Sequence, residues 1–454
     1  MKLSVIGGGG VRSMFLAKSI AQKAALLNID ELVFMDTDEK KLNIYGRIAR
    51  EVSKRLNPDL KFILTSDAIE AVKGADYVIT TIRVGGDDMR VGDERIALNK
   101  GVLGQETTGA AGLSFAMRSV DALAGYCELI KQYSKSGCKV FNFTNPAGVV
   151  SQTLRDMGYD FTYGICDAPS GMLRTFEKLY GCDEGSARGE VYGLNHLSYF
   201  SSVKLDGKEM LGDIIENEKA YTDTDLRYFD KSLLRERGAI LNEYLYYFYY
   251  REKAVANILA AQQTRGEQIA QINKKMTAEL ENIDIDNDFE KALSIFEYWY
   301  GERENNYMAA ESGVKRKIKW HFDIFEKDDG GYAGVALNFI RICQSGGVDS
   351  MILCVPNNGA IDGLLDTDVV EITCDIKDGD AHPHHFGSVD EQNLELIRRV
   401  KIYERLASEA IRTKSRVKAI EALTLHPLVA SYSLACELVD KYIEHNRDYT
   451  GEWK

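Results

Sequence analysis

An α/β fold is the architecture that this sequence of 454 residues predicts, with a doubly wound parallel sheet first and a helix-rich α+β region after it. Three observations predict this fold class. The first apolar run ends in four consecutive glycines, and strand-like apolar runs then alternate with amphipathic stretches. Beyond about residue 200 the chain becomes charged and helix-prone. Alternation of this kind indicates a mostly parallel sheet with helices on both faces.

The first unit of the predicted sheet has the pattern of a dinucleotide site. An apolar run at 2–6 is followed by a glycine turn, and the next run, 31–35, ends at Asp36. The turn consists of Gly7, Gly8, Gly9 and Gly10. Glycines let the backbone approach a pyrophosphate at a helix N-terminus, and the acid accepts from a ribose hydroxyl, which favours NAD over NADP. The turn departs from the usual pattern, because Arg12 or Ser13 stands at the third glycine position.

The remaining elements follow from the hydrophobic pattern. Strands are expected at 75–82, 140–143, 198–205, 350–355 and 369–374. Helices are expected at 39–57, 113–136, 237–250, 266–283, 286–312 and 392–444, the last one broken near residues 426–427. The segment 382–385, His-Pro-His-His, is interpreted as a loop, because proline disturbs the geometry of a metal site and no acid or thiol lies directly beside it.

Residues 83–109 form a stretch rich in glycine and charge, with little periodicity in its first half. A long irregular segment inside a compact domain is usually functional or mobile. Within it, Arg83 and Arg90 are candidate anion clamps, because a guanidinium fork matches a carboxylate or a phosphate. The alternative is a solvated loop with surface ion pairs.

Three strand-like runs between residues 141 and 196 end in small or polar residues: 145–147, 166–169 and 193–196. In α/β folds, sites gather at the carboxyl ends of strands. These endings offer the thiol of Cys166, the carboxylate of Asp167, the amide of Asn145 and the imidazole of His196. A thiolate and an imidazole suit a borderline divalent metal better than magnesium or calcium. The alternative is a buried thiol and a hydrogen-bonded core histidine.

Composition excludes several classes of function. The net charge of −13 argues against nucleic acid as a partner, since phosphate backbones require a basic face. No apolar run has the length of a membrane span, and the first run is a strand rather than a targeting segment, so we expect a cytoplasmic protein. The eight cysteines are scattered without a CxxC pair, which indicates reduced thiols.

Taken together, these blocks resemble glycoside hydrolase family 4, the NAD- and metal-dependent glycosidases. The similarity covers nearly the whole chain. The blocks are VIGGGG at the N-terminus, IRVGG at 82–86, GQETTG at 104–109, NFTNPAG at 142–148, GICDAP at 164–169, YGLNH at 192–196, EYLYYFYY at 243–250, TRGEQ at 264–268, NNGAI at 357–361 and VKIYERL at 400–406. Within the family the sequence is most similar to the 6-phosphoglucosidases. The resemblance implies a lactate/malate dehydrogenase-like Rossmann domain.

The resemblance also implies a reaction that differs from ordinary two-carboxylate hydrolysis. NAD oxidises the C3 hydroxyl of the sugar, which makes the C2 proton acidic, and a divalent metal, expected to be Mn²⁺, holds the resulting enolate. A base removes the C2 proton, the aglycone leaves from C1, water adds and the hydride returns. The expected substrate is a phosphorylated glycoside.

Site residues follow from the same resemblance. Cys166 and His196 match the metal ligands, and Tyr244, the first tyrosine of its run, matches the catalytic base. A phenol titrates near 10, so a nearby metal or arginine would have to lower its pKa. Three residues match positions that contact the sugar or its phosphate: Arg90, Asn145 and Arg265. Asp36 and the glycine turn match the NAD site, and we place Arg83 with them.

Asp167 is a departure that bears on the anomer. Many 6-phospho-β-glucosidases of the family carry asparagine there, whereas 6-phospho-α-glucosidases carry aspartate. An acid beside the metal could protonate the leaving oxygen of an α-glucoside. Because QETTG and NFTNP look more like β-type members, we expect a 6-phospho-β-glucosidase-like enzyme that could also accept α-anomers.

The predicted division is a NAD-binding Rossmann domain at 1–165 and a domain for catalysis, substrate binding and oligomerisation at 166–454, in a homodimer or homotetramer. Three alternatives remain open: a family 4 glycosidase acting on non-phosphorylated galactosides or uronides, a lactate/malate-type dehydrogenase, and a non-enzymatic NAD sensor. A dehydrogenase would accumulate NADH, whereas the glycosidase would turn over without accumulation.

Overall fold

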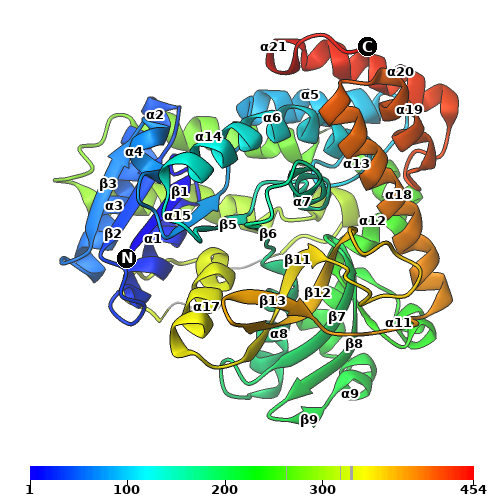
Figure 1. Cartoon of the computed structure of the whole chain (residues 1–454), viewed down its shortest axis with the longest axis horizontal. Coiled ribbons are helices and arrows are strands. Elements are labelled where there is room, and N and C mark those ends of the chain that lie inside the picture. The colour runs from blue at the N-terminus through cyan, green and yellow to red at the C-terminus, as the bar shows by residue number, and fades with distance from the viewer. Residues whose placement is uncertain (262, 317–318, 328–330) are drawn as a thin grey trace.

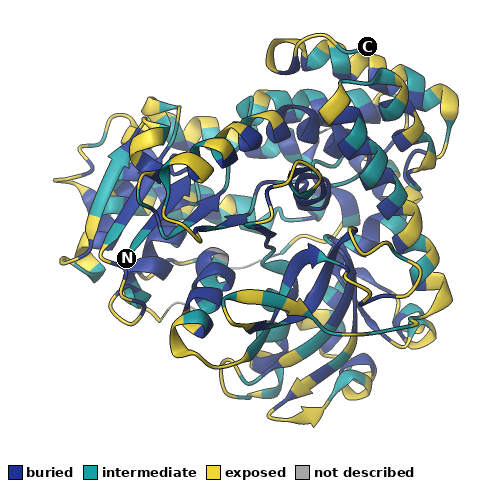
Figure 2. Ribbon diagram, viewed as in Figure 1, coloured by how far each residue is buried: buried dark blue, intermediate teal, exposed yellow. Residues whose placement is uncertain are grey.

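The computed structural model describes residues 1–261, 263–316, 319–327 and 331–454 (Figure 1). Its centre is a nine-stranded sheet in the order β13-β12-β11-β6-β5-β4-β1-β2-β3. The inner strands of this sheet are largely buried, and the exposed residues lie on outer helix faces, in loops and on edge strands (Figure 2). The predicted α/β fold class is confirmed.

The N-terminal half supplies six parallel strands. They are β1 (Lys2–Ile6), β2 (Glu31–Met35), β3 (Lys61–Thr65), β4 (Tyr77–Thr80), β5 (Lys139–Asn142) and β6 (Thr162–Gly164). Strand order reverses at β1, which pairs with β2 on one side and β4 on the other. Parallel sheets place ligand sites at such a switch point, outside the carboxyl ends of the strands.

Helices connect these strands. They are α1 (Ser13–Lys23), α2 (Glu39–Lys41), the π-helical turn η1 (Leu42–Gly46), α3 (Arg47–Leu56), α4 (Ala68–Val72), α5 (Gly86–Leu98), α6 (Gly109–Tyr133), α7 (Ala147–Asp156) and α8 (Ala168–Tyr180). The helix predicted at 39–57 is confirmed as three successive helical pieces. The helix predicted at 113–136 begins earlier, at Gly109.

The prediction of an irregular segment at 83–109 is wrong for its central part, which forms α5. Gly85 and Gly86 turn the chain with φ of 79° and 63°, and two acids in the first turn of the helix favour its positive end. Gly92, inside the helix, weakened the helical pattern. The structure explains this glycine, because a Cβ at position 92 would overlap the imidazole of His445.

The second half extends the same sheet. Strands β11 (Asp349–Pro356), β12 (Val369–Lys377) and β13 (Asp380–Pro383) run antiparallel, and β11 pairs with β6 at Cys354 and Gly164. The sheet therefore continues across the predicted boundary at 165/166, and the division into two domains stays a prediction. The interpretation of 382–385 as a loop is wrong for its first two residues, which end the edge strand β13; proline is tolerated at such an edge.

A smaller sheet packs beside β12. It contains β7 (Arg188–Leu194), β8 (Leu197–Leu205), β9 (Lys208–Glu209) and β10 (Ile240–Leu241). The helix predicted at 237–250 is only partly present, because β10 leads into the 3-10 turn η3 (Glu243–Leu245) and the short α12 (Tyr246–Tyr249). The Asn242 side chain accepts from the Tyr244 N–H at 3.0 Å and so starts the turn here.

The remaining helices surround both sheets. They are α9 (Leu211–Glu216), α10 (Ala220–Asp223), the 3-10 turn η2 (Asp225–Tyr228), α11 (Lys231–Arg237), α13 (Arg251–Ala260), α14 (Arg265–Leu280), α15 (Phe289–Asn305), α16 (Ala309–Ser312), α17 (Gly331–Ser345), α18 (Glu391–Thr413), α19 (Arg416–Leu425), α20 (Tyr432–His445) and α21 (Arg447–Thr450). The helix predicted at 266–283 is confirmed as α14, and the one predicted at 286–312 is divided into α15 and α16. The helical region predicted at 392–444 is confirmed with its break after Leu425, and it has a second break at 414–415. In the part of the chain that the structure describes, no helix combines the length and apolarity needed to cross a bilayer.

Candidate active site

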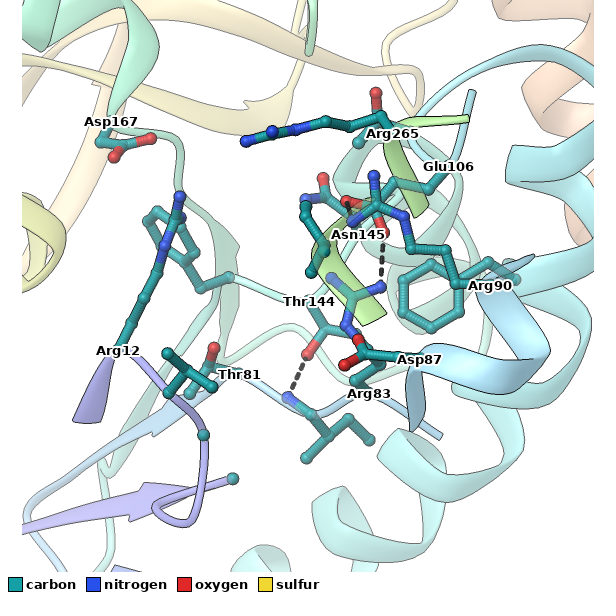
Figure 3. A pocket seen from close by; sticks show the side chains of 18 of the residues that line it. Arg12, Thr81, Arg83, Asp87, Arg90, Glu106, Thr144, Asn145, Asp167 and Arg265 are labelled. Atoms are coloured by element: carbon teal, nitrogen blue, oxygen red, sulfur yellow. Dashed lines mark hydrogen bonds and ion pairs between the residues drawn. The ribbon is translucent and has the colours of Figure 1, made fainter. Parts of the chain in front are cut away.

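A cavity of about 940 Å³ opens at the carboxyl ends of the parallel strands (Figure 3). Elements from both halves of the chain line it. With one exception, all the residues predicted for the site lie on its wall: Gly7, Gly9, Gly10, Asp36, Arg83, Arg90, Asn145, Cys166, Asp167, His196, Tyr244 and Arg265. The exception is Gly8. A side chain there would meet Phe34 of β2 at 2.6 Å, so this glycine permits close packing instead.

One end of the cavity has the features of a dinucleotide site. Gly7 has a φ of 100°, and the Gly9 N–H donates to Asp36 Oδ2 at 2.9 Å. The other oxygen of Asp36 accepts from the Asp38 N–H at 3.0 Å. Burial raises the pKa of Asp36, while these two backbone donors oppose the shift. The carboxylate is thus fixed by the backbone, with lone pairs left to accept from hydroxyl groups.

Cys166, His196 and Tyr244 form what we call the thiol–imidazole corner. Cys166 Sγ lies 3.6 Å from His196 Nε2, and the Ala168 N–H donates to Sγ at 3.5 Å. His196 occupies the tight turn between β7 and β8 with a φ of 61°. The Tyr244 ring stacks on its imidazole, with centroids 3.8 Å apart and planes 13° apart. The structure therefore brings together strand endings that the sequence predicted to be neighbours.

The corner fits a divalent metal. Cys166 Sγ and His196 Nε2 are 3.6 Å apart, close enough for both atoms to bind one ion. Burial lowers the pKa of His196 to about 3, which keeps the imidazole neutral, the form that binds metals. The described residues contain no group of three or more histidine, cysteine and acidic side chains that could hold an ion. Further ligands would have to be other oxygen atoms, from the protein or from bound substrate and solvent.

The Tyr244 hydroxyl accepts from the Tyr307 hydroxyl at 3.4 Å. Burial raises the pKa of Tyr244 far above its ordinary value, and the nearby Glu243 carboxylate adds to the shift. The protein itself therefore does not lower the pKa of Tyr244, as a base at this position requires. Burial also raises the pKa of Glu243, to about 8. An added cation at the corner would favour the phenolate.

Asp167 follows the thiol and stands at the N-cap of α8. Burial raises its pKa, while the Arg12 guanidinium opposes the shift. Figure 3 shows the Arg12 side chain extending toward Asp167 from the start of α1, and Arg265 extending toward the same region from the other side. Asn145 lies between these groups and the arginine-rich end, just before Pro146.

Arg83, Arg90, Glu94 and Glu106 form what we call the arginine wall. Arg83 and Arg90 both pair with Glu106, the latter at 3.1 Å, and Arg90 Nε also donates to Glu94 at 2.8 Å. Burial opposes ionisation of Glu106, but the two arginines outweigh it and hold its pKa well below its ordinary value. The two candidate anion clamps are thus already paired with acids, and these ion pairs lie on the cavity wall rather than in the solvated loop given as the alternative.

Other cations in the cavity are less fully paired. Arg265 Nη2 donates to the Arg303 carbonyl at 2.9 Å, whereas its buried Nη1 has no hydrogen-bond partner among the residues described. Burial lowers the pKa of Arg303 to about 10, and the neighbouring Arg12 adds to this effect. Sequence reasoning missed Arg12, Arg303 and Glu106. Arg12 could have been found from its position as a departure in the glycine pattern, whereas Arg303 lies in α15 without any motif.

The fold and the site define an α/β protein with a Rossmann-type half whose cavity also contains a thiol–imidazole pair suited to a metal. Residues 2–182 match the model of family 4 glycosyl hydrolases, and residues 191–429 match the model of the C-terminal domain of that family. The chain therefore belongs to glycosyl hydrolase family 4, and it is an enzyme of the glycosidase class.

Individual relatives agree with this assignment. The chain is 31% identical to the 6-phospho-beta-glucosidase BglT of Thermotoga maritima, over 99% of both chains. A solved structure of the Thermotoga maritima 6-phospho-beta glucosidase with manganese, NAD⁺ and glucose-6-phosphate has a TM-score of 0.81, at 29% identity over 99% of both chains.

A 6-phospho-alpha-glucosidase from gut microorganisms, solved with NAD and glucose-6-phosphate, has a TM-score of 0.82 at 26% identity over the full length of both chains. A lactate dehydrogenase from a deep-sea metagenome library has a TM-score of 0.52 at 11% identity, over 90% of this chain and 98% of its own. That last likeness concerns the fold alone. It confirms the prediction of a fold like that of the lactate and malate dehydrogenases.

Proposed function

We propose that this protein hydrolyses 6-phosphoglucosides, with NAD and a divalent metal, expected to be Mn²⁺, as cofactors. The observation that carries the proposal is the thiol–imidazole corner, which faces the same cavity as Asp36 and the glycine turn. A simple dehydrogenase of this fold needs the nucleotide end but has no use for Cys166. Relatives named as 6-phosphoglucosidases, and neighbours solved with NAD, manganese and glucose-6-phosphate, support the choice of cofactors and substrate.

Each residue then has a role. Gly7, Gly9 and Gly10 allow the cofactor to approach the backbone, and Asp36 accepts from its ribose hydroxyls, with Gly8 as a packing residue. Arg83 belongs to the same cofactor site, and its ion pair with Glu106 holds the guanidinium at the cavity. Cys166 and His196 bind the metal. When bound, the two cofactors supply a reversible hydride acceptor for C3 and a Lewis acid that makes the C2 proton acidic.

The proton transfers fall to side chains of the protein. Tyr244 takes the proton from C2, since its hydroxyl lies in the cavity and its ring is fixed against His196. Asp167 gives a proton to the leaving oxygen, because burial raises its pKa and so favours the protonated acid. Both assignments follow the general rule that geometry comes first and pKa second in identifying acids and bases.

Substrate binding falls to Asn145, Arg90 and Arg265. Arg265, with a donor nitrogen that no described residue accepts from, is the best placed to bind a phosphate oxygen. Arg90 lies on the same cavity and contacts the sugar with its guanidinium held in place by Glu94 and Glu106. Arg12 and Arg303, which line the same cavity, add positive charge for the phosphate.

We further propose β-glucosides as the principal substrates, with α-glucosides also accepted, because Asp167 can protonate either leaving group. The site would then act on a small phosphorylated sugar rather than on nucleic acid or a membrane. A cytoplasmic location and a homodimer or homotetramer complete the proposal, together with the division into a NAD-binding domain at 1–165 and a second domain at 166–454.

The experiment is hydrolysis of four nitrophenyl glucosides, α and β, each with and without a 6-phosphate. NAD, Mn²⁺ and thiol are present and then omitted one at a time. We expect cleavage of the phosphorylated pair alone, lost without NAD or metal and without NADH accumulation. Cleavage of the unphosphorylated pair would contradict the assignment of the phosphate, and steady accumulation of NADH would indicate a dehydrogenase.

A further inference from the structure

A second cavity, of about 20 Å³, borders His196. A buried water needs roughly 10–15 Å³ of such volume and two to four polar partners, so this space has room for one water molecule. The residues around it come from five of the sequence blocks noted above, and include Thr108, Gly148, His196, Tyr403 and Glu404. His196 and Asn195 line both this cavity and the main one. The block VKIYERL, which has no role in the reaction as described so far, provides Tyr403 and Glu404.

One buried polar atom at this small cavity lacks a hydrogen bond, and a buried carboxylate lies beside it. His196 Nδ1 has no partner in the described part of the chain. Glu404 Oε2 contacts the Lys401 ammonium, and the carboxylate keeps lone pairs that can accept from a water molecule. Because His196 Nε2 faces Cys166, a metal at the corner would take the lone pair of Nε2. The proton of the neutral ring must then be on Nδ1, where it needs an acceptor.

The fold fixes the Glu404 carboxylate next to this space. Tyr403 and Glu404 follow Val400 by three and four residues, so all three lie on one face of α18. Lys401 is fully buried and also donates to Gln152 Oε1 at 3.2 Å, which ties the pair to α7. Gly148 in the first turn of α7 makes room, because a Cβ there would overlap Glu404 Oε1.

We propose that Glu404 is a positioning residue for His196, acting through one buried water that accepts from Nδ1–H and donates to the carboxylate. The arrangement fixes the tautomer and the orientation of the imidazole and makes Nε2 a better ligand. It is the water-bridged form of the carboxylate–histidine–metal arrangement that recurs at metal sites. Lys401 compensates the buried charge of Glu404. The inference rests on the proposed function, since it assumes that His196 binds a metal.

The test measures the Mn²⁺ dissociation constant of the NAD-bound protein from the electron paramagnetic resonance of free Mn²⁺. Removing both charges in the double variant Lys401→Met/Glu404→Leu avoids leaving a lysine unpaired. We expect a 10- to 100-fold weaker affinity for Mn²⁺, with NAD affinity unchanged. The conservative Glu404→Gln keeps an acceptor oxygen and should bind Mn²⁺ within about threefold of the wild type. Activity at saturating Mn²⁺ should fall less than the affinity for the metal.

Asp368→Asn is the matched control. Asp368 is another fully buried acid paired with a cation of α18, Arg405, and it lines neither cavity. It should lower thermal stability without changing Mn²⁺ affinity. If the double variant does not fold, Gly148→Ala replaces it, because a methyl group there displaces the carboxylate and should weaken Mn²⁺ binding over the same range.

A folded double variant, or a folded Gly148→Ala protein, that binds Mn²⁺ like the wild type would overturn the role of Glu404. In that case His196→Ala would still abolish Mn²⁺ binding, and the proposed function would stand. A wild-type protein that binds no Mn²⁺, or a His196→Ala variant that binds it normally, would overturn both proposals together.

Discussion

The arginine wall and the thiol–imidazole corner lie on the same cavity but satisfy their polar groups in different ways. On the wall, Arg83 and Arg90 share Glu106, and Arg90 also holds Glu94. At the corner, His196 has a buried nitrogen without a hydrogen-bond partner among the described residues, and it offers no opposite charge to Cys166. The ion pairs of the wall hold its shape, whereas the thiol and the neutral imidazole of the corner leave a positive charge to be supplied by a ligand.

This difference indicates where stability and activity separate. Changing a residue of the wall should mainly cost folding free energy, because it leaves a buried charge without its partner. Changing a residue of the corner should mainly cost binding or turnover. The predictions below test that separation, and they begin with the change expected to have the largest effect.

Tyr244→Phe should lower turnover of a 6-phosphoglucoside by about 10²- to 10⁴-fold, the range typical of losing a general base. The ring can still stack on His196, so metal and NAD should bind as before. The decisive measurement is exchange of the C2 proton in deuterated water, which the variant should fail to catalyse. Tyr246→Phe, in the same tyrosine run but hydrogen-bonded to the Glu311 carbonyl, is the control and should exchange normally. Normal exchange by Tyr244→Phe would place the base elsewhere.

Cys166→Ser should weaken Mn²⁺ binding by more than the 10- to 100-fold that is typical of an outer-shell change, because it removes a direct ligand. A hydroxyl is a poor substitute for a thiolate at a borderline metal. Mn²⁺ titration and thermal unfolding of the metal-free protein should separate ligand loss from destabilisation. Cys436→Ser, at another half-buried thiol that lies outside the main cavity, should change neither. Unchanged Mn²⁺ affinity in the Cys166 variant would remove the thiol from the ligand set.

Glu106→Gln should lower the free energy of unfolding by about 3–5 kcal/mol, since Arg83 and Arg90 would lose their common buried partner. Because the folded pKa of Glu106 is depressed, its contribution is fully present above the unfolded value, near 4.3, and is lost as pH falls below it. Urea unfolding at pH 7 and pH 4 should therefore give a smaller difference between variant and wild type at the lower pH. An equal difference at both would contradict the depressed pKa. Glu216→Gln, at an exposed ion pair with Arg235, should have a much smaller effect at pH 7.

The same contrast explains how far the sequence could predict the site. Cys166 and His196 stand at the ends of strands, in short sequence blocks whose residue types already indicate a metal site. The structure brings them together as expected, with Tyr244 stacked on the imidazole. Arg83 and Arg90 were visible too, but their pairing with Glu106 was not, because a pair of residues 23 apart in sequence depends on how α5 folds back. Gly92 weakened the helical pattern of that segment in the sequence. A glycine is needed there because a side chain would overlap the imidazole of His445, which is distant in sequence.

Elements were easier to predict than their ends. Hydrophobic periodicity located β1, β2 and the long helices. It failed at 237–250, where Asn242 separates the strand β10 from the 3-10 turn and short helix that contain the tyrosines. The position of Tyr244 against His196 follows from that division. Periodicity describes which face of an element is apolar, but a cap or a close contact with another segment decides where the element begins.

A third set of charges lies on the protein surface and can be compared with the buried ion pairs of the arginine wall. His384 donates or accepts through both ring nitrogens, with Nδ1 2.9 Å from Glu190 of β7 and Nε2 2.9 Å from Asp375 of β12. Burial opposes protonation of His384, but the two carboxylates outweigh it and raise its pKa. Ser350 also donates to Asp375, and the neighbouring His382 adds a second imidazole facing that acid.

His384→Gln should therefore have the smallest effect, at most about 1 kcal/mol, because solvent screens a partly exposed pair. Since the folded pKa is raised, the stabilisation is fully present below the unfolded value, near 6.5, and is lost as pH rises through the folded value. Urea unfolding should show a difference between wild type and variant at pH 6 that disappears at pH 9, which is the opposite pH trend to that of Glu106. Both clusters hold charge between opposite partners, so a difference that grows with pH at His384 would show that hydrogen bonding by a neutral ring, rather than ion pairing, joins the two sheets there.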